Sequence, residues 1–433
     1  MHIYFSGIGG TAITSLALIA HQAGYSVSGS DARPSAYLDY LAKHGVTDTH
    51  IGVDDDFIAQ THAKQPIDWF VYGSAQPIDF PDHPEFEFCR RQGIKMSKRD
   101  ELLGKIIKDK DLKLIAVAGT HGKTTTTAMA TWIFKQLGLP VSYSGGAKLG
   151  FGDVSEYDPK SGYFLYEADE YDRNFLGFYP KLALISGIDY DHPDIYPTRQ
   201  SYEEAFLEFF DQSQEVVIWQ DDAERLALEA LPKYTILDRG DPAIEAIRLA
   251  GAVNRQDAWL AANGLAKELD RPVDELVDIL NRFPGLSRRF EQIVPRLYTD
   301  SAHTPPKIRG ALQLAHEIAG NDVVIVYEGL HNLRQHFIKD QLADLFESVK
   351  KLYIVPSYLA REDKDLEILT PEKLLDLLDK PVRDKARPAA LDDSLKNTIQ
   401  GHMDAGELVL CLSAGGAGSL DEWLRHTFHT GQV

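Results

Sequence analysis

The residues best suited to chemistry lie in VAGTHGKTTTTA, where a glycine-rich turn precedes a lysine and four threonines. An apolar strand leads into the turn, and apolar residues at helical spacing follow it. A lysine in this position reaches the β- and γ-phosphates of a nucleotide, and the next hydroxyl can bind Mg²⁺. The pattern therefore predicts a phosphate site over Gly119 to Thr124, with Lys123 and Thr124 as its central side chains.

The loop departs from the usual phosphate-loop spacing, which places a glycine five residues before the Gly-Lys pair. Val117 occupies that place, although the strand, the turn and the lysine are all present. The threonines at 125–127 are unusual at a helix start, because a branched Cβ disfavours helix. Their hydroxyls either contact the ligand or cap the backbone of the first turn, and the sequence leaves both interpretations open.

Acidic residues follow two apolar strands of the same region, in YFLYEADEYD and LALISGIDYDH. The carboxyl ends of parallel strands meet at one edge of a sheet, where ligands bind. Glu167 directly follows the first strand and supplies the hard oxygen that Mg²⁺ prefers. We predict a metal site of Thr124, Glu167 and His192, with ordinary polar surface as the alternative for His192. Glu170 and Asp172 are expected to be solvated loop charges.

A second glycine-rich turn, Gly7-Ile8-Gly9-Gly10, follows a short apolar strand and precedes a helix. GIGGTA fits G-x-G-x-x-G/A, whose glycines let the backbone approach a diphosphate at a helix N-terminus. Asp31 ends the next strand, where such folds carry an acidic residue for the ribose. The motif predicts nucleotide binding without choosing the nucleotide. An NAD-linked oxidoreductase is one alternative, and a tight turn that binds nothing is another.

Two further groups of residues stand near the start of the last third of the chain. Arg288 and Arg289 occur in GLSRRFE, where an arginine can neutralise a transferring phosphoryl group, although paired arginines are more often surface charge. Asp300 and His303 follow a strand in TDSAHTPP and precede a helix that prolines open. These residues are candidates for a site near a domain junction.

Strands alternate with helical segments along the chain, which is typical of α/β folds with parallel sheets. We predict three domains, at 1–108, 109–292 and 293–433. The first and third are expected to be Rossmann-like, and the central one to contain a P-loop ATPase-like parallel sheet. The polar stretch 104–113 is predicted to be a linker. The third domain is predicted to hold four strands, in RLYTDSAHTPP, DVVIVYEGL, KLYIVPS and ELVLCLSAGG.

The composition favours a soluble globular protein of a reducing compartment. The chain has 65 Asp and Glu against 45 Lys and Arg, a formal net charge of −20 that disfavours nucleic acid and anionic membranes. Its two cysteines, Cys89 and Cys411, form neither a disulfide framework nor a zinc ligand set. We recognise no signal peptide and no long apolar run. We therefore expect a cytoplasmic protein without nucleic-acid or membrane partners.

Together these features resemble the Mur ligase family, which builds the peptide of bacterial peptidoglycan. The resemblance covers most of the chain and rests on GIGGTA, GTHGKTTTT, EADEYDRNFL, DYDHPDIY, SRRFE and DSAHTPP. The family has the same short phosphate-loop spacing. It also has the same order of domains: one for a UDP-sugar, one for ATP and a third that closes over both.

The resemblance implies an amide-bond ligase that uses ATP and Mg²⁺. ATP would phosphorylate the lactyl carboxylate of UDP-N-acetylmuramate, and the amine of L-alanine would attack the acyl phosphate. Phosphorylation is needed because a carboxylate is a poor electrophile, and the transferring phosphoryl group needs positive charge around it. A related family member attaches a whole tripeptide to the same sugar nucleotide, so a tripeptide is the alternative amine. We expect a monomer or a weak homodimer.

By resemblance, each motif position carries a role. Thr124 and Glu167 would hold one Mg²⁺, and His192 would bind a second. Asn254 would contact adenine, Arg289 the γ-phosphate and Asp300 the ribose, while His303 would lie near the reacting centre. The residues expected to serve the reaction are Lys123, Glu167, His192, Arg289 and His303. Those expected to bind ATP are Gly119, Thr120, His121, Gly122, Lys123, Thr124, Thr125, Asn254, Arg289 and Asp300. Those expected to bind the UDP-sugar are Gly7, Ile8, Gly9, Gly10, Asp31 and Ser74.

The chain also departs from the family pattern. Val253 stands where the family usually has a histidine, and Thr304 replaces a second histidine after His303. EGLHNLRQHF occupies the place of a Gln-Pro-His-Arg run, with Arg334 one place out of register. These departures concern the amino-acid pocket more than the ATP site. A UDP-sugar sensor with an inactive ATP site is a further alternative, which the intact phosphate loop disfavours.

Overall fold

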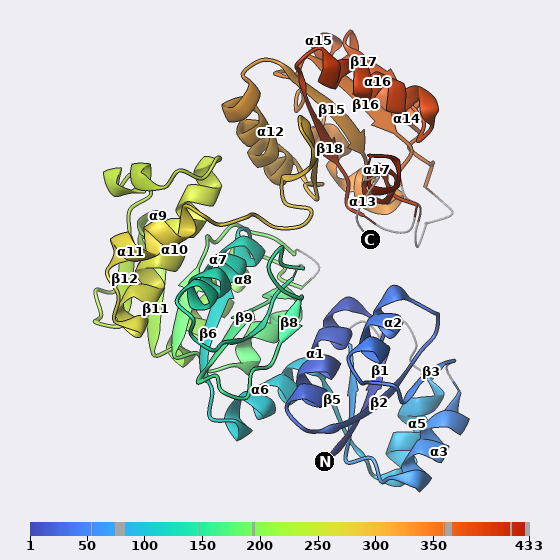
Figure 1. The fold of residues 1–433 in the computed structure, drawn as a ribbon, viewed down its shortest axis with the longest axis vertical. Helices are drawn as coiled ribbons and strands as arrows, with labels where there is room; N and C mark the ends of the chain where they lie inside the picture. Colours follow the sequence, from blue (N-terminus) through green and yellow to red (C-terminus); the bar gives the residue numbers. More distant parts are fainter. Residues whose placement is uncertain are drawn as a thin grey trace. The chain divides into compact units, whose positions relative to one another are not determined.

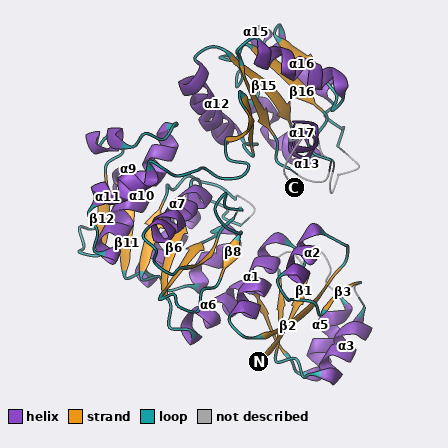
Figure 2. Cartoon of the chain, in the orientation of Figure 1, coloured by secondary structure: helices purple, strands orange, loops and turns teal. Residues whose placement is uncertain are grey.

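The computed structural model describes residues 1–52, 54–73, 83–146, 148–192, 195–357, 359, 366–415 and 418–428. Within these ranges the chain forms three sheets flanked by helices (Figures 1 and 2) and divides into two compact units. The predicted α/β class with mainly parallel sheets is confirmed. No helix in the described ranges is long and apolar enough to cross a membrane. Unit 1 comprises Met1–Arg248 and Arg255–Phe283, and unit 2 comprises Leu249–Asn254 and Pro284–Val433.

The first sheet of unit 1 has the strand order β3-β2-β1-β4-β5, and all neighbouring strands pair in parallel. Side chains of β1 alternate between its faces: Ile3 and Phe5 join the cluster around α1, whereas Tyr4 packs with α3 and α5. Burial on both faces is typical of parallel sheets. The bounds are β1 His2–Ser6, α1 Thr11–Gln22, β2 Ser26–Asp31, α2 Ala36–Lys43, β3 Thr49–Ile51, α3 Asp55–Lys64, β4 Trp69–Tyr72, α5 Pro84–Gln92, β5 Lys95–Lys98 and α6 Arg99–Asp109.

The second sheet of unit 1 has the order β12-β11-β10-β6-β9-β7-β8, and only its edge pair β7–β8 is antiparallel among the described strands. Its central strand β6 is buried from Leu114 to Ala118 and ends at the phosphate loop. The bounds are β6 Lys113–Ala118, α7 Lys123–Gln136, β7 Ser142–Ser144, β8 Ser155–Glu156, β9 Tyr163–Glu167, η1 Tyr171–Gly177, β10 Leu182–Ile185, α8 Arg199–Gln212, β11 Glu215–Trp219, α9 Gln220–Arg225, β12 Tyr234–Leu237, η2 Pro242–Ala246, α10 Ala252–Leu269 and α11 Val273–Leu280.

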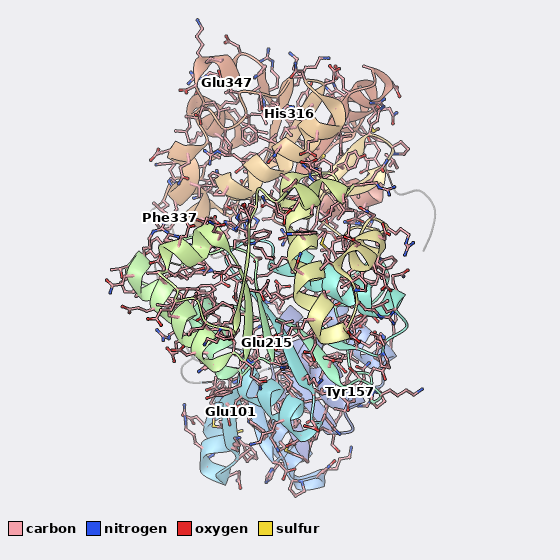
Figure 3. All side chains as sticks on the ribbon, turned by 90° about the vertical axis from the view of Figure 1, so that its left-hand side faces the viewer. Glu101, Tyr157, Glu215, His316, Phe337 and Glu347 are labelled. Atoms are coloured by element: carbon pink, nitrogen blue, oxygen red, sulfur yellow. The ribbon has the colours of Figure 1, made fainter. Side chains whose placement is uncertain are left out.

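One hydrophobic cluster joins the two sheets of unit 1. It includes Leu16 of α1, Leu103 of α6 and Tyr166 of β9, together with core residues of both sheets. Polar contacts add to it: the backbone N–H of Tyr157, labelled in Figure 3, donates to Gln22 Oε1 over 2.8 Å. The two sheets therefore form one packed unit. The predicted domain boundaries, between residues 108 and 109 and between residues 292 and 293, stay predictions.

The prediction of a linker over 104–113 was wrong for its first part. α6 runs Arg99–Asp109, and its Ile106 and Ile107 are buried. The lysines of this stretch made its sequence predominantly polar, which led to the linker prediction. Its isoleucines nevertheless continue the apolar helix face that begins with Leu102 and Leu103. Only three residues, 110–112, connect this helix to β6.

The sheet of unit 2 has the order β13-β14-β18-β15-β16-β17, with β13 antiparallel to β14 and the other described pairs parallel. The four predicted strands are present as β14, β15, β16 and β18, and the sequence missed β13 and the short β17. The bounds are β13 Glu291–Val294, β14 Leu297–Asp300, α12 Pro305–Ala319, β15 Val323–Glu328, α13 Asn332–Ile338, η3 Lys339–Gln341, β16 Lys351–Val355, α14 Pro371–Asp376, α15 Lys380–Arg383, β17 Ala386–Pro388, α16 Asp393–Asp404, β18 Leu408–Leu412 and α17 Leu420–Phe428.

Candidate active site

The loop between β6 and α7 has a backbone that favours glycine. Gly119 and Gly122 have φ angles of +134° and +81°, a region that other residues rarely adopt. A Cβ on Gly119 would also lie 2.8 Å from the carbonyl oxygen of Gly187. α7 begins directly after this turn, and the first N–H groups of a helix lack intrahelical partners and carry partial positive charge. The turn is therefore suited to an anion such as phosphate.

Lys123 opens α7 and is held by two oxygen atoms. Its Nζ donates to the carbonyl of Gly119 over 2.5 Å and pairs with Glu170 Oε2 at 2.7 Å. Glu170 is 1% exposed, so the prediction that it is a solvated loop charge was wrong. Burial raises the pKa of Glu170, but His192 and Lys123 outweigh burial and hold that pKa below its usual value. The buried carboxylate thus acts as the counter-ion of the loop lysine.

His192 lies beside the other oxygen of the same carboxylate. Its Nε2 is 3.7 Å from Glu170 Oε1 and 3.9 Å from Asp191 Oδ2. Burial lowers the pKa of His192, but Glu170 and Asp191 raise it above its ordinary value overall. The structure therefore places Lys123 and His192 beside the two oxygens of the same carboxylate. Metal binding by His192 would require a neutral imidazole.

Thr124 and Glu167 form a second pair at the same loop. The Thr124 hydroxyl donates to Glu167 Oε1 over 2.8 Å, and the backbone N–H of Gly146 donates to Oε2 over 2.6 Å. A Cβ on Gly146 would lie 2.7 Å from both carboxylate oxygens, so a larger residue there would displace the carboxylate. Of the three predicted metal ligands, the structure brings Thr124 and Glu167 into contact, whereas His192 contacts Glu170 instead.

The remaining residues of the loop mainly hold its shape. The backbone N–H of Thr120 donates to the Gly187 carbonyl over 2.8 Å, and its hydroxyl donates to the Asp189 carbonyl over 2.6 Å. Thr126 and Thr127 are buried, and their hydroxyls have no partner within the described residues. Thr125 is half-buried at the loop. The predicted phosphate contacts of Thr120, His121 and Thr125 stay predictions.

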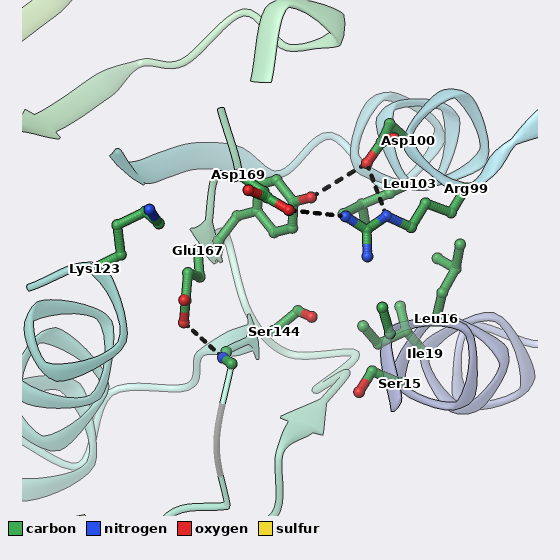
Figure 4. Close-up of a pocket in the computed structure, with 14 residues that line it drawn as sticks. Ser15, Leu16, Ile19, Arg99, Asp100, Leu103, Lys123, Ser144, Glu167 and Asp169 are labelled. Carbon is green, nitrogen blue, oxygen red and sulfur yellow. Dashed lines mark hydrogen bonds and ion pairs between the residues drawn. The ribbon is translucent and has the colours of Figure 1, made fainter. Parts of the chain in front are cut away.

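A cavity of about 330 Å³ opens beside the loop in unit 1 (Figure 4). α1 contributes mostly apolar side chains, whereas charged side chains come from the start of α6, from the phosphate loop and from the end of β9 and the residues after it. The helix after the first glycine-rich turn and the phosphate loop thus line one space. The lining residues are Ala12, Ser15, Leu16, Ile19, Arg99, Asp100, Leu103, Lys123, Ser144, Gly145, Gly146, Tyr166, Glu167 and Asp169.

The first glycine-rich turn is shaped by Asp31. The backbone N–H of Gly9 donates to Asp31 Oδ2 over 2.9 Å, and a Cβ on Gly9 would lie 2.7 Å from Ser35 Oγ. Gly7 has φ +70°, and its carbonyl accepts from the Gly10 N–H over 3.0 Å. Ile8 is fully buried beneath the turn. The predicted UDP-sugar contacts of these residues stay predictions, and Ser74 lies outside the described residues.

In unit 2, Asp300 ends β14 and holds the turn on either side of it. Its Oδ2 accepts from the Phe290 N–H over 2.7 Å, and its Oδ1 accepts from the Ala302 N–H over 2.6 Å. Burial raises the pKa of Asp300, and the guanidinium of Arg289 opposes that shift. Arg289 therefore lies within electrostatic reach of Asp300. Asn254, also in unit 2, donates its amide to the Ala250 carbonyl over 2.8 Å.

His303 lies beyond the same turn of unit 2. Its Nδ1 is 2.6 Å from the Ser301 carbonyl oxygen. Burial, together with the nearby charge of Lys307, lowers the pKa of His303 to about 4. The imidazole is therefore neutral at neutral pH, with Nδ1 as the donor and Nε2 left as an acceptor. Assembly of Asn254, Arg289, Asp300 and His303 with the residues of unit 1 stays a prediction.

Comparisons with known proteins identify the family. The model of the Mur ligase family, catalytic domain, matches residues 2–111, and that of the Mur ligase middle domain matches 117–243. A UDP-N-acetylmuramate--L-alanine ligase of Renibacterium salmoninarum is 30% identical over 453 residues, which cover 95% of this chain and 93% of the relative. This chain belongs to the Mur ligase family. A ligase of the same name from Nocardioides sp. is 31% identical and covers the same shares.

Solved structures of Mur ligases share the fold. UDP-N-acetylmuramate-alanine ligase MurC from Thermotoga maritima has a TM-score of 0.73, with 23% identity and 96% of each chain covered. A murein peptide ligase, mpl, from Psychrobacter arcticus has a TM-score of 0.65, with 23% identity and 100% of each chain covered. The resemblance to the Mur ligase family, stated from the motifs alone, is confirmed.

Some site residues of this Mur ligase chain were assigned another role from the sequence or were not singled out. Glu170 holds the loop lysine, whereas the sequence predicted a solvated loop charge. Arg99 and Asp100 line the cavity from the start of α6. They follow the strand KMSK, whose sequence has no run of apolar residues, so nothing marked a strand end there.

Proposed function

We propose that this chain is an ATP-dependent ligase that joins L-alanine to UDP-N-acetylmuramate through an acyl phosphate. The observation that carries the proposal is the phosphate loop with Lys123 held by buried Glu170 beside a cavity. The name UDP-N-acetylmuramate--L-alanine ligase, borne by relatives that match 95% of the chain, supplies the substrates.

The first step transfers a phosphoryl group to a carboxylate. A carboxylate oxygen of the muramate bonds to the γ-phosphorus of ATP, the bond from that phosphorus to the β–γ bridging oxygen breaks, and ADP leaves with the electron pair. Negative charge spreads over the equatorial oxygens during transfer, and Lys123 lies at the loop to neutralise it. Glu170 keeps the lysine ammonium at the mouth of the loop through its 2.7 Å contact.

Mg²⁺ is part of the proposal, and the residues present fit it. Thr124 Oγ1 and Glu167 Oε1 are hard oxygen donors 2.8 Å apart, at the start of α7 and the end of β9. Within the described residues no group of three or more His, Cys, Asp or Glu side chains is arranged to hold a metal. Mg²⁺ sites commonly combine one or two carboxylates with phosphate oxygens and water, which this pair allows. Bound there, Mg²⁺ would neutralise charge on the phosphates.

The cavity suits the acid substrate. Leu16 and Ile19 give it an apolar wall on the helix that follows the turn Gly7–Gly10. A diphosphate at that turn would place the rest of a sugar nucleotide along this helix, with Lys123 on the opposite wall. We assign the UDP-sugar contacts to the turn and to Asp31, which shapes it.

The second step forms the amide. The nitrogen of L-alanine bonds to the acyl carbon, the bond from that carbon to the phosphate oxygen breaks, and inorganic phosphate leaves with the electron pair. The nitrogen loses a proton to solvent. His303 would remain neutral beside the amine, because its pKa is about 4. Such an imidazole is too weak a base to keep a proton at neutral pH. It is suited to accept a hydrogen bond at Nε2 and to orient the amine.

Phosphate release tests the proposal. The full chain is incubated with ATP, Mg²⁺ and UDP-N-acetylmuramate, and L-alanine, other amino acids or the murein tripeptide is added in turn. We expect release only when UDP-N-acetylmuramate and L-alanine are both present, with the amide product identified by mass spectrometry. Release only with the tripeptide would assign the alternative amine. A change in nicotinamide fluorescence without any phosphate release would instead favour an oxidoreductase.

Location and assembly belong to the same proposal. Both cysteines, Cys89 and Cys411, are free and buried, which fits a reducing cytoplasm. We propose a monomer or a weak homodimer, and sedimentation velocity over a range of concentrations tests it.

A further inference from the structure

The acidic segment 166–172 of unit 1 contacts two neighbours at once. Some of its side chains contact residues 98–100, where β5 of the first sheet passes into α6, and others contact the phosphate loop. The two sets alternate along the segment, so that one short stretch touches both sheets. The first set is Tyr166, Asp169 and Asp172, and the second is Glu167 and Glu170.

Arg99 is the centre of the first set (Figure 4). Its Nη2 donates to Asp169 Oδ2 over 3.4 Å, and its Nε is 3.5 Å from Asp100 Oδ1. The Tyr166 hydroxyl donates to the same Asp100 oxygen over 3.3 Å. We call residues 98–100 and 166–172 the clasp.

The charges of the clasp depend on Arg99. Asp100 is 7% exposed, and its Oδ2 has no hydrogen-bond partner within the described part of the chain. Burial raises the pKa of Asp100, and Arg99 opposes that shift. Without the guanidinium, Asp169 would face a second carboxylate with no cation between them. Repulsion between like charges would then favour movement of the segment.

Asp169 also fixes the backbone that follows Glu167. Its Oδ1 accepts from the Tyr171 N–H over 3.1 Å, and its carbonyl accepts from the Phe175 N–H over 3.0 Å. Since Asp169 lies between Glu167 and Glu170, a displacement of Asp169 moves both acids that hold the phosphate loop. Arg99 and Asp169 line the same cavity as Lys123 and Glu167, so an occupant of the cavity touches both sides.

We propose that Arg99 is a positioning residue whose clasp couples binding of the sugar nucleotide to the arrangement of Glu167 and Glu170 at the ATP site. The identity of the two ligands rests on the proposed function above. The clasp includes Glu167, the proposed Mg²⁺ ligand, and its Arg99 and Asp169 line the cavity. It makes the affinity for one ligand depend on the presence of the other.

Titration calorimetry measures this coupling. The dissociation constant of UDP-N-acetylmuramate is determined with and without a saturating non-hydrolysable ATP analogue and Mg²⁺. We expect the analogue to tighten sugar-nucleotide binding at least about fivefold in the unmodified chain. In Arg99→Ala and in Asp169→Asn the factor should fall to about one. The Asp169 side chain is 39% exposed, so Asp169→Asn should fold. It therefore tests the proposal even if Arg99→Ala does not fold.

Arg173→Ala is the matched control. Arg173 follows the clasp directly and pairs with Glu208, and the two side chains are 48% and 50% exposed. The control should keep the full coupling factor. A coupling factor of one in the unmodified chain, or an unchanged factor in both clasp variants, would overturn the proposal. So would an Arg99→Ala variant that binds UDP-N-acetylmuramate tenfold more weakly by itself while keeping the factor, because Arg99 would then be a substrate ligand.

Hydrogen exchange separates this proposal from the proposed function. It needs no ligand, so it tests the clasp even if UDP-N-acetylmuramate does not bind. Amides of residues 168–173 should exchange faster in Arg99→Ala than in the unmodified chain. In the Arg173→Ala control, the amides of residues 168–171 should exchange at the same rate as in the unmodified chain. Unchanged exchange at these amides would refute the clasp, whatever the substrates are.

Discussion

Removing the charge of Glu170 is expected to destabilise unit 1 by a measurable amount. Its Oε2 lies 2.7 Å from Lys123 Nζ, and the two side chains are 1% and 15% exposed. Glu170→Gln keeps the shape and one acceptor oxygen but removes the negative charge between Lys123 and His192. Lys123→Met is the complementary change, because it leaves the buried carboxylate with only an imidazole, 3.7 Å away.

The magnitude follows from which group is left without a partner. A hydrogen bond to a charged group contributes roughly 1.5–3 kcal/mol, and Lys123 keeps the Gly119 carbonyl, so Glu170→Gln should cost about 2 kcal/mol of unfolding free energy. Lys123→Met should cost about 3 kcal/mol, since breaking a buried pair leaves an uncompensated charge. The double variant should also cost about 3 kcal/mol, so the interaction energy of the pair is about 2 kcal/mol.

The same pair has a predicted pH dependence. Lys123 and His192 hold the pKa of Glu170 below its unfolded value of 4.5. A lowered carboxylate pKa stabilises the fold above the unfolded pKa, and this contribution is lost as the pH falls through the folded pKa. Glu170→Gln should therefore show a smaller loss of stability below pH 4.5 than the unmodified chain.

Urea unfolding followed by tryptophan fluorescence is the assay. Of the five tryptophans, four lie in unit 1 and only Trp423 lies in unit 2, so the signal reports mainly on unit 1. The two units are fitted as separate transitions, because a chain of several domains does not unfold in one step. Asp172→Asn is the control: its partner Lys98 is 44% exposed, so the change should stay within about 0.5 kcal/mol.

One result would refute the reasoning. If the costs of Glu170→Gln and Lys123→Met add to within about 0.5 kcal/mol in the double variant, the two residues do not interact in the folded chain. The loop lysine would then lack the counter-ion that the structure assigns to it, and the proposed placement of its ammonium would have to be abandoned.

Three further predictions concern the other parts of the site. Asp31→Asn should raise the KM for UDP-N-acetylmuramate and leave that for ATP unchanged, because Asp31 shapes only the first turn; equal increases in both would contradict this. Gly146→Ala should raise the Mg²⁺ concentration needed for half-maximal phosphate release, since a Cβ would lie 2.7 Å from both Glu167 oxygens; an unchanged Mg²⁺ requirement counts against Glu167 as a metal ligand. His303 should titrate in NMR with a midpoint near pH 4, and its burial should destabilise the fold progressively as the pH falls from 6.5 towards 4; a midpoint near 6.5 would show that the ring is solvated.

The sequence predicted best where local signals agreed with the fold. The strand before the phosphate loop is apolar throughout, and the glycines of the loop have the positive φ angles that explain their presence. The strands that were not predicted are β3, β5, β7, β8, β11, β12, β13 and β17. β7, β8 and β17 are two or three residues long and carry no apolar alternation.

The candidate site was harder to predict because burial depends on the tertiary fold. Glu170 and Asp172 stand in one acidic run and look alike in the sequence, yet Glu170 is buried against Lys123 while Asp172 meets the exposed Lys98. Nothing local distinguishes them, since the difference lies in which sheet each side chain faces. Arg99 was overlooked for the same reason: its partner Asp169 is distant in sequence and meets it only in the folded unit.

The continuous hydrophobic cluster of unit 1 limits how the gene can be cut or recombined. A fragment that stops after residue 108 would leave Leu103 and Ile106 without the side chains of β9 that belong to their cluster. A hybrid enzyme could take its first hundred residues from one family member and the rest from another. Its core side chains before and after residue 108 would then have to pack together as they do in this cluster. Exchange of nucleotide-sugar specificity between relatives is therefore more readily achieved by altering surface turns than by transplanting a whole lobe.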